Sequence, residues 1–124
     1  MTAIGFIIII FICIISYLLG SINLSIILSK LLGKGDIREQ GSKNAGTTNT
    51  LRVLGKGPAL LVFIWDVLKG ALAVIIARGL IGWLGDPSNS AGVAFNYQIV
   101  YAFGIMCASI AAILGHNYPA FFRI

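Results

Sequence analysis

Residues 3–29 read AIGFIIIIFICIISYLLGSINLSIILS, and this stretch decides the fold class because it contains no charged side chain. At the rise of an α-helix it would extend roughly 40 Å, enough to cross a hydrocarbon core of about 30 Å with some tilt. A cleaved signal peptide is the competing interpretation. It fits poorly, because no basic residue precedes the apolar run, the run is too long, and no Ala-x-Ala-like site follows it. We predict a first transmembrane helix over about residues 3–32.

The composition of the whole chain agrees with a membrane protein. Of its 124 residues 58% are hydrophobic and only 10% are charged, and the mean hydropathy is +0.96. The apolar residues form long runs and do not alternate as on a soluble strand or helix. Two more spans are predicted over about residues 58–78 and 91–114, with Gly79–Leu84 as an interfacial turn. The predicted fold is an all-α, polytopic transmembrane helix bundle in one integral membrane domain, residues 1–124.

The basic residues predict the orientation of this bundle. The connection 33–57 contains Lys34, Arg38, Lys43, Arg52 and Lys56, whereas the connection 78–90 contains Arg78 alone. Cytoplasmic loops carry the excess of Lys and Arg, so we expect residues 33–57 in the cytoplasm and the N-terminus outside. The formal net charge of +5 does not indicate a nucleic-acid partner, because no aromatic platform accompanies these basic residues.

The loop between the first two spans carries most of the polar chemistry. Residues 35–55 read GDIREQGSKNAGTTNTLRVLG. Glycine lets backbone N–H groups turn toward an anion, short polar side chains add donors, and a guanidinium binds phosphate through two hydrogen bonds. The candidate groups are Gly41, Ser42, Asn44, Gly46, Thr47, Thr48, Asn49 and Arg52. On chemistry alone a phosphate pocket and a capping loop are equally good interpretations, the latter with Thr48 or Asn49 capping a turn that Gly55 ends.

Two groups of polar residues lie elsewhere in the apolar segments. Asp66 and Lys69 are three apart on one helix face, and each alone would cost about 2.5–3.5 kcal/mol at the centre of a span. They are expected to form an ion pair, either structural or beside an active site. Gly20, Ser21, Asn23 and Ser25 form a small, polar patch that is expected either to pack helices closely or to contact substrate.

The remaining candidates for chemistry are one histidine and two cysteines. His116 either caps a helix end or lines a site. Cys13 and Cys107 belong to no metal-binding or disulfide pattern, and no metal site is predicted.

The run from Asp36 to Arg52 resembles the first signature of the bacterial acyl-phosphate:glycerol-3-phosphate acyltransferases. Three further features resemble the same family in the same order: Gly20-Ser21-Ile22, Asp66…Lys69-Gly70 and Gly115-His116-Asn117-Tyr118-Pro119. The resemblance implies a multi-pass enzyme of the bacterial cell (inner) membrane that works without a cofactor. It would transfer a fatty acyl group from a long-chain acyl phosphate to the 1-hydroxyl of glycerol 3-phosphate, giving lysophosphatidic acid and inorganic phosphate for phospholipid biosynthesis. Its partners would be these two substrates and the lipid bilayer, and no protein partner is indicated.

The resemblance also implies roles for individual residues. Ser42 and Arg52 would be catalytic, and Asp66 and Lys69 would support the site. The substrate and its phosphate would be bound by Gly41, Asn44, Gly46, Thr48, Asn49, His116 and Asn117.

Two departures from the family stand out. Lys43 occupies a position where glycine is usual, and family members continue past residue 124, so this chain is expected to be the N-terminal part of a longer family fold. The alternative function is a small membrane transporter or a non-catalytic bundle subunit, with Asp66 and Lys69 as its intramembrane polar element.

Overall fold

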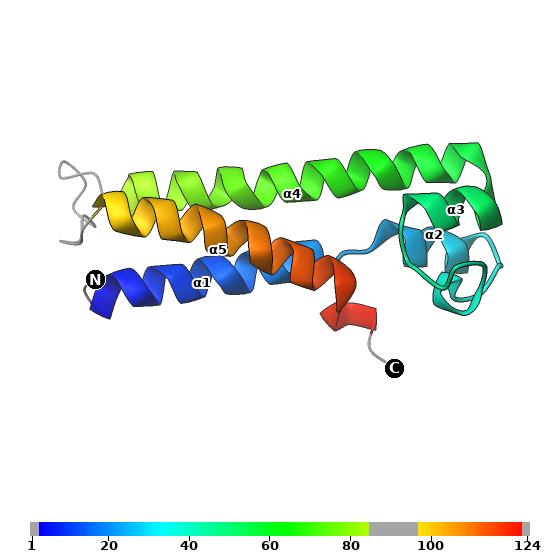
Figure 1. Ribbon diagram of the computed structural model, residues 1–124, viewed down its shortest axis with the longest axis horizontal. Coiled ribbons are helices and arrows are strands. Elements are labelled where there is room, and N and C mark those ends of the chain that lie inside the picture. The colour runs from blue at the N-terminus through cyan, green and yellow to red at the C-terminus, as the bar shows by residue number, and fades with distance from the viewer. Residues whose placement is uncertain (1–2, 85–96, 123–124) are drawn as a thin grey trace. The chain divides into compact units, whose positions relative to one another are not determined.

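The computed structural model describes residues 3–84 and 97–122, and every regular element in these ranges is helical (Figure 1). In chain order the elements are α1 (Ala3–Gly20), α2 (Leu24–Leu31), η1 (Ile37–Glu39), α3 (Thr47–Leu54), α4 (Lys56–Leu84), α5 (Tyr97–Asn117) and η2 (Ala120–Phe122). Three stretches are long and apolar enough to cross a membrane: Ala3–Leu31, Lys56–Leu84 and Tyr97–Phe122. The predicted all-α fold with three spans is confirmed.

The chain divides into two compact units, which are described one at a time. Unit 1 consists of Met1–Ser21 and Gly70–Ile124, and unit 2 consists of Ile22–Lys69. Helix α4 contributes its first half to unit 2 and its second half to unit 1. The expectation of a single integral membrane domain stays a prediction.

In unit 1, α1 and α5 lie along each other at close range (Figure 1). A Cβ atom at Gly20 would collide with the backbone of Ala112, and one at Gly115 would collide with the backbone of Tyr17. The two glycines therefore allow backbone contact between the helices, as small residues do in membrane bundles. Beside this contact lies an apolar core made of Ile8, Ile12, Ala77, Ile81, Val100 and Ala108.

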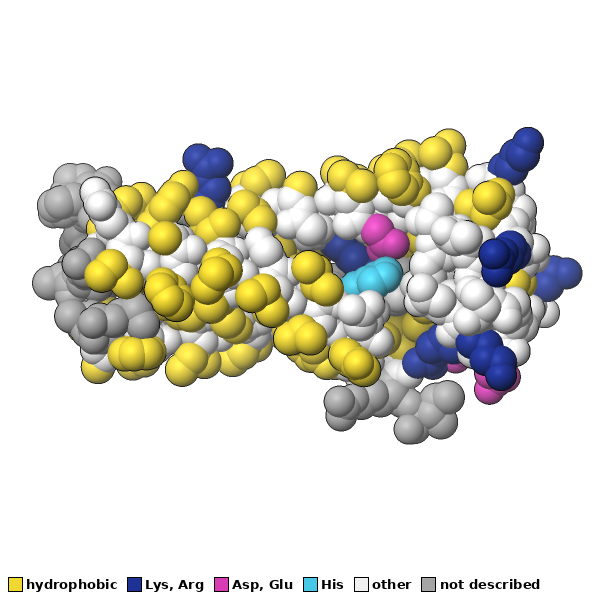
Figure 2. Space-filling view, in the orientation of Figure 1, with side chains coloured by type: hydrophobic (Ala, Val, Ile, Leu, Met, Phe, Trp, Pro, Cys, Tyr) yellow, Lys and Arg dark blue, Asp and Glu magenta, His cyan; other side chains and the backbone are white. Residues whose placement is uncertain are grey.

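The outer faces of these helices are apolar, as expected for spans surrounded by lipid. Figure 2 shows hydrophobic side chains along the helices of unit 1. Phe6, Ile75 and Ile113, one each from α1, α4 and α5, are 54%, 61% and 60% exposed. Exposure of large apolar side chains on three helices indicates a hydrocarbon environment rather than water.

One prediction about α4 is wrong, because Gly79–Leu84 is not a turn. The helix continues to Leu84. Ala77 and Ile81 lie four residues apart and are both fully buried in the core of unit 1. Burial of this face outweighs the low helix propensity of the two glycines in the segment. Pro58 lies in the first turn of this helix, where proline is tolerated because an N–H there would have no helical partner.

Helix α5 reaches further than the sequence suggested at its C-terminal end. It ends at Asn117, so His116 and Asn117 lie in its last turn and not in a segment after it. Pro119 explains the end point, because the residue before a proline is disfavoured in helical conformation. The predicted start at residue 91 lies outside the described residues.

The first predicted span is interrupted between α1 and α2. Asn23 leaves the helical conformation with φ −100° and ψ 102° and becomes the N-cap of α2, its side-chain oxygen accepting from the Ile26 N–H. Asparagine is among the best N-cap residues, so a polar side chain at this position favours a new helix start. The first span therefore consists of two helices.

Candidate phosphate-binding site

The loop that follows α2 in unit 2 is folded back onto that helix. Ser29 donates from Oγ to the Gly35 carbonyl at 2.8 Å, closing the turn that leaves α2. Ile37, in η1, has no exposed surface and anchors the loop through its apolar side chain. Side chains of the loop therefore project from a fixed backbone.

An ion pair stiffens the first part of the loop. Arg38 donates from Nε to Asp36 Oδ1 at 3.0 Å and from Nη2 to Asp36 Oδ2 at 2.6 Å, a two-bond pairing of guanidinium with carboxylate. Asp36 Oδ1 also accepts from the Arg38 backbone N–H at 3.0 Å as the N-cap of η1. The hydrogen bonds and charge of Arg38 lower the pKa of the Asp36 carboxyl from 3.8 to about 2. The Arg38 guanidinium thus binds a residue of its own loop.

Asn49 organises the second part of the loop. Its side chain is buried and makes three hydrogen bonds: Oδ1 accepts from the Ser42 N–H at 2.9 Å, and Nδ2 donates to the carbonyls of Ile37 at 3.2 Å and Gln40 at 2.9 Å. These bonds join α3 to η1 and to the turn that carries Ser42. A side chain so fully engaged shapes the pocket and is poorly placed to bind phosphate directly.

Gly41 is required by this arrangement. Its φ of +56° lies in the left-handed region, and a Cβ atom would collide with Asn49 Oδ1. At Gly46 the backbone is extended, and a Cβ atom would make only ordinary contact with Asn44. The structure therefore explains a glycine at position 41 and gives no steric reason for one at position 46.

The N-terminus of α3 lacks a side-chain cap. The N-cap is Gly46, which makes no side-chain capping hydrogen bond, and Thr48 and Asn49 lie inside the helix. The interpretation in which one of these two residues caps the helix is therefore wrong, whereas the predicted helix end at Gly55 is confirmed. The first N–H groups of a helix, together with its dipole, favour an anion when no side chain satisfies them.

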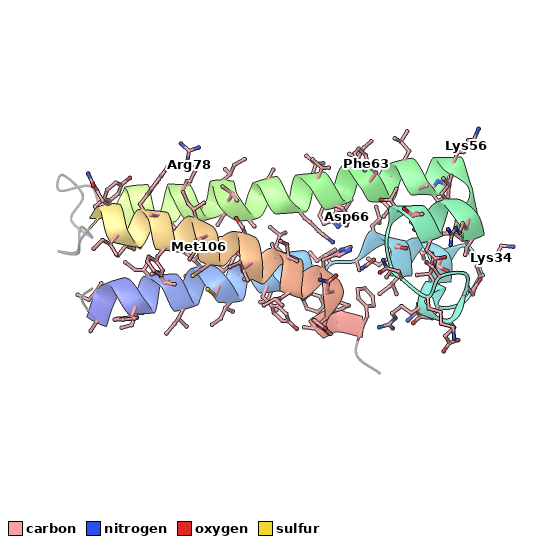
Figure 3. The ribbon with its side chains drawn as sticks, in the orientation of Figure 1. Lys34, Lys56, Phe63, Asp66, Arg78 and Met106 are labelled. Carbon is pink, nitrogen blue, oxygen red and sulfur yellow. The ribbon has the colours of Figure 1, made fainter. Side chains whose placement is uncertain are left out.

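Around this helix start lie the exposed polar side chains of the loop. The uncharged ones belong to Ser42, Asn44 and Thr48, whereas exposed Arg52 lies in the last turn of the same helix. Lys43, beside Ser42, takes a left-handed conformation with φ +62°, which shows why glycine also suits this position. Within unit 2, the side chains of Lys34 and Lys56 point away from the ribbon (Figure 3). The loop thus separates buried side chains that hold its shape from exposed ones available to a ligand.

The expected pair on α4 is present in unit 2. Lys69 Nζ lies 2.8 Å from Asp66 Oδ1, and Lys69 is buried with 3% of its surface exposed. Lys69 Nζ also donates to the Ile22 carbonyl at 3.3 Å, which accepts from Trp65 Nε1 at 2.8 Å. The pair is therefore tied to the interruption between α1 and α2.

His116 and Asn117 belong to unit 1, in the last turn of α5. Their predicted place beside the loop stays a prediction. No group of three or more His, Cys, Asp and Glu side chains that could hold a metal ion occurs among residues 3–84 and 97–122.

Comparison with known proteins decides the family. Residues 10–124 match the sequence profile described as "Glycerol-3-phosphate acyltransferase". The chain belongs to this family. It is 45% identical over 107 residues to the glycerol-3-phosphate acyltransferase of Halalkalibacterium halodurans, covering 86% of this chain and 44% of the relative. Identity to the Synechococcus elongatus enzyme of the same name is 47% over 109 residues, or 87% of this chain and 47% of the relative.

A solved structure supports the same assignment. The crystal structure of PlsY (YgiH), an integral membrane glycerol 3-phosphate acyltransferase in its glycerol 3-phosphate form, matches with a TM-score of 0.66 and 38% identity. The match covers 92% of this chain and 48% of that one. This acyltransferase-family chain therefore spans about half the length of the relatives it matches.

In this acyltransferase-family chain, Asn23 and Ser25 hold the loop in place, a role that was not predicted from the sequence. Asn23 Nδ2 donates to the Ala45 carbonyl at 3.2 Å, and Ser25 Oγ lies 2.6 Å from Thr50 Oγ1. The polar patch was expected to pack helices closely or to contact substrate, whereas these two side chains bind the loop and α3. The signal in the sequence that could have indicated this role is the series of polar residues just before the loop, which are buried in the structure.

The pairing of Asp36 predicts an acid dependence of stability. Because the folded-state pKa is about 2 and the ordinary value is 3.8, the ionised carboxylate stabilises the fold above about pH 4. This stabilisation is lost as the pH falls from about 4 through 2. Asp36→Asn should lower the thermal midpoint in detergent at neutral pH, and the deficit relative to wild type should shrink to a small remainder at pH 2. Glu39→Gln, at an exposed neighbour, is the control, and a deficit independent of pH would contradict the assignment.

Proposed function

We propose that the protein transfers a fatty acyl group from a long-chain acyl phosphate to the 1-hydroxyl of glycerol 3-phosphate, releasing lysophosphatidic acid and inorganic phosphate. The observation that carries the proposal is the uncapped start of α3, with exposed Ser42 in the loop before it and exposed Arg52 in the last turn of the same helix, in a chain of this family. A helix N-terminus, a hydroxyl and a guanidinium together suit a phosphate group.

The proposed chemistry needs little beyond positioning. An acyl phosphate is an activated mixed anhydride, so the substrate hydroxyl attacks the acyl carbon, and the bond from that carbon to the phosphate oxygen breaks. Phosphate leaves with the electron pair, and a substrate phosphate oxygen takes the hydroxyl proton. Arg52 and Ser42 hold a substrate phosphate, Thr48 and Asn44 border it, and Gly41 and Asn49 keep the loop in shape. Orientation and preorganised charge supply most of the rate enhancement in such a site.

The proposed location is the bacterial cell membrane, with the loop 33–57 in the cytoplasm and the N-terminus outside. The support is the excess of basic residues in that loop. A cytoplasmic loop at the membrane surface can meet water-soluble glycerol 3-phosphate while the acyl chain of the donor stays in lipid. His116 and Asn117 are proposed to line the same pocket, on the strength of the family signature alone.

The test is product formation by membranes that contain the protein expressed from its complete gene. Labelled glycerol 3-phosphate is supplied with a long-chain acyl phosphate or with the matching acyl-CoA, and lysophosphatidic acid is measured. We expect product with acyl phosphate only. Absence of product with acyl phosphate, while the protein is folded in the membrane, would contradict the proposal and favour a transport or structural role.

Ser42→Ala sharpens this test. Loss of a hydrogen bond to a charged group is expected to lower kcat/KM for glycerol 3-phosphate about 10- to 100-fold. The matched control is Ser109→Ala in α5, because that hydroxyl donates to the Ile105 carbonyl of its own helix. Equal activity of the two variants would remove Ser42 from the site.

A further inference from the structure

The interruption between α1 and α2 frees backbone polar groups at the start of unit 2. Inside a membrane such groups need partners within the protein, since lipid offers none. Ile22 and Asn23 lie at this interruption, and Asn23 has only 1% of its surface exposed. The partners that these residues find therefore decide how the chain enters the loop.

The Ile22 carbonyl receives two donors from α4. Trp65 Nε1 donates at 2.8 Å and Lys69 Nζ at 3.3 Å, while Asp66 holds the same ammonium at 2.8 Å. A carbonyl oxygen has two lone pairs, so two donors fix its direction. Because the peptide unit is planar, they also fix the plane that joins Ile22 to Asn23.

Asn23 passes this constraint to the loop. Its Oδ1 caps α2 by accepting from the Ile26 N–H, and its Nδ2 donates to the Ala45 carbonyl at 3.2 Å. A second tie runs from Ser25 to Thr50, whose hydroxyl donates to the Gly46 carbonyl at 2.8 Å. Ala45 and Gly46 are the last residues before α3. The start of α3 is thus connected through hydrogen bonds to Lys69.

We propose that Lys69, held by Asp66, is a positioning residue for the phosphate site, acting through the Ile22 carbonyl and Asn23 on Ala45 and the start of α3. The kinetic test of this inference rests on the proposed function, whereas the test of loop order does not. Charged side chains inside a membrane are costly, and simple helix packing does not require the Asp66–Lys69 pair. A positioning role explains why α4 carries it.

Loop order is tested first, by hydrogen exchange of the amides in residues 40–46. The double variant Lys69→Met/Asp66→Asn removes the pair without leaving one charge buried alone. The amides of Ser42 and Lys43, which are hydrogen-bonded to Asn49 and Gln40, should exchange at least about tenfold faster, while α5 keeps its protection. Arg78→Met is the matched control, because it removes an exposed cation from the same helix. Lys69→Arg, which keeps the charge, should restore most of the protection.

Kinetics give the second readout. The double variant should raise the KM for glycerol 3-phosphate about tenfold with kcat less affected, because a displaced pocket binds phosphate poorly. An inactive wild-type protein would refute the proposed function and leave the exchange experiment to decide the positioning role. If residues 40–46 of the double variant exchange at the wild-type rate while its melting temperature is lowered, the pair is merely structural and the inference is overturned.

A variant at Asn23 keeps the test decisive if the double variant does not fold. Asn23→Ser retains a good N-cap for α2 and loses the amide donor to Ala45. It should reproduce the faster exchange of residues 40–46 without loss of helix protection in α2. Unchanged exchange of residues 40–46 in this variant would contradict the proposed connection between the helix interruption and the loop.

Discussion

Replacing Arg52 with alanine is expected to lower kcat/KM for glycerol 3-phosphate about 100- to 1,000-fold. Arg52 is exposed in the last turn of α3, and no carboxylate among the described residues is paired with it. A guanidinium that binds phosphate through two charge-assisted bonds contributes more than a single neutral donor. Arg52→Lys should recover only part of the loss, because an ammonium lacks the planar pair of donors.

The matched control for Arg52 is Lys34→Ala. Lys34 is an exposed cation of the same loop, and its side chain points away from the ribbon (Figure 3). Its removal changes the net charge equally and should alter kcat/KM less than about threefold at physiological salt. Similar losses in both variants would show that the loop attracts substrate through its overall charge and not through a specific contact.

Gly115→Ala is expected to cause the largest loss of stability, about 3 kcal/mol or more. A Cβ atom at this position would collide with the backbone of Tyr17 in α1, and backbone atoms cannot move aside as a flexible side chain can. The helices α1 and α5 would have to separate along their contact. The measurement is the thermal midpoint of the purified protein in detergent, supported by the yield of folded protein in membranes.

Gly82→Ala in α4 provides the control for this effect. Apart from its own helix backbone, no atom of the described residues would lie within 4 Å of its Cβ, so the substitution should be neutral or slightly stabilising through better helix propensity. Gly20→Ala should behave like Gly115→Ala, because its Cβ atom would meet the backbone of Ala112. Equal midpoints for Gly115→Ala and Gly82→Ala would contradict the close contact between α1 and α5.

The spans could be predicted from composition, whereas their interruptions and ends depended on distant contacts. Long apolar runs predicted three crossings, because a bilayer demands about the same length of apolar helix everywhere. Asn23 is a local signal for the break, but the Ile22 carbonyl beside it depends on partners 43 and 47 residues away on α4, Trp65 and Lys69, which no local pattern indicates. The helical state of Gly79–Leu84 depends likewise on burial of Ile81 in the core of unit 1.

The residue types of the loop predicted phosphate chemistry, but their division of labour came from the fold. Asn49 and Ser42 look alike as short polar residues in the sequence. In the structure one is buried with three hydrogen bonds, and the other is exposed beside a helix start. Only tertiary contacts decide which of two similar side chains builds the pocket and which one is available to a ligand.

We propose that the start of α3 and its neighbouring side chains hold the phosphate of glycerol 3-phosphate. Amide signals of the protein labelled with ¹⁵N-threonine test it directly, because threonine occurs in the printed sequence only at positions 2, 47, 48 and 50. The signals of Thr47 and Thr48 should shift in a saturable way with glycerol 3-phosphate and not with glycerol. The Thr50 amide, already bonded to the Gly46 carbonyl at 2.9 Å, should move less. Thr47 and Thr48 signals that stay in place at saturating glycerol 3-phosphate would contradict the account.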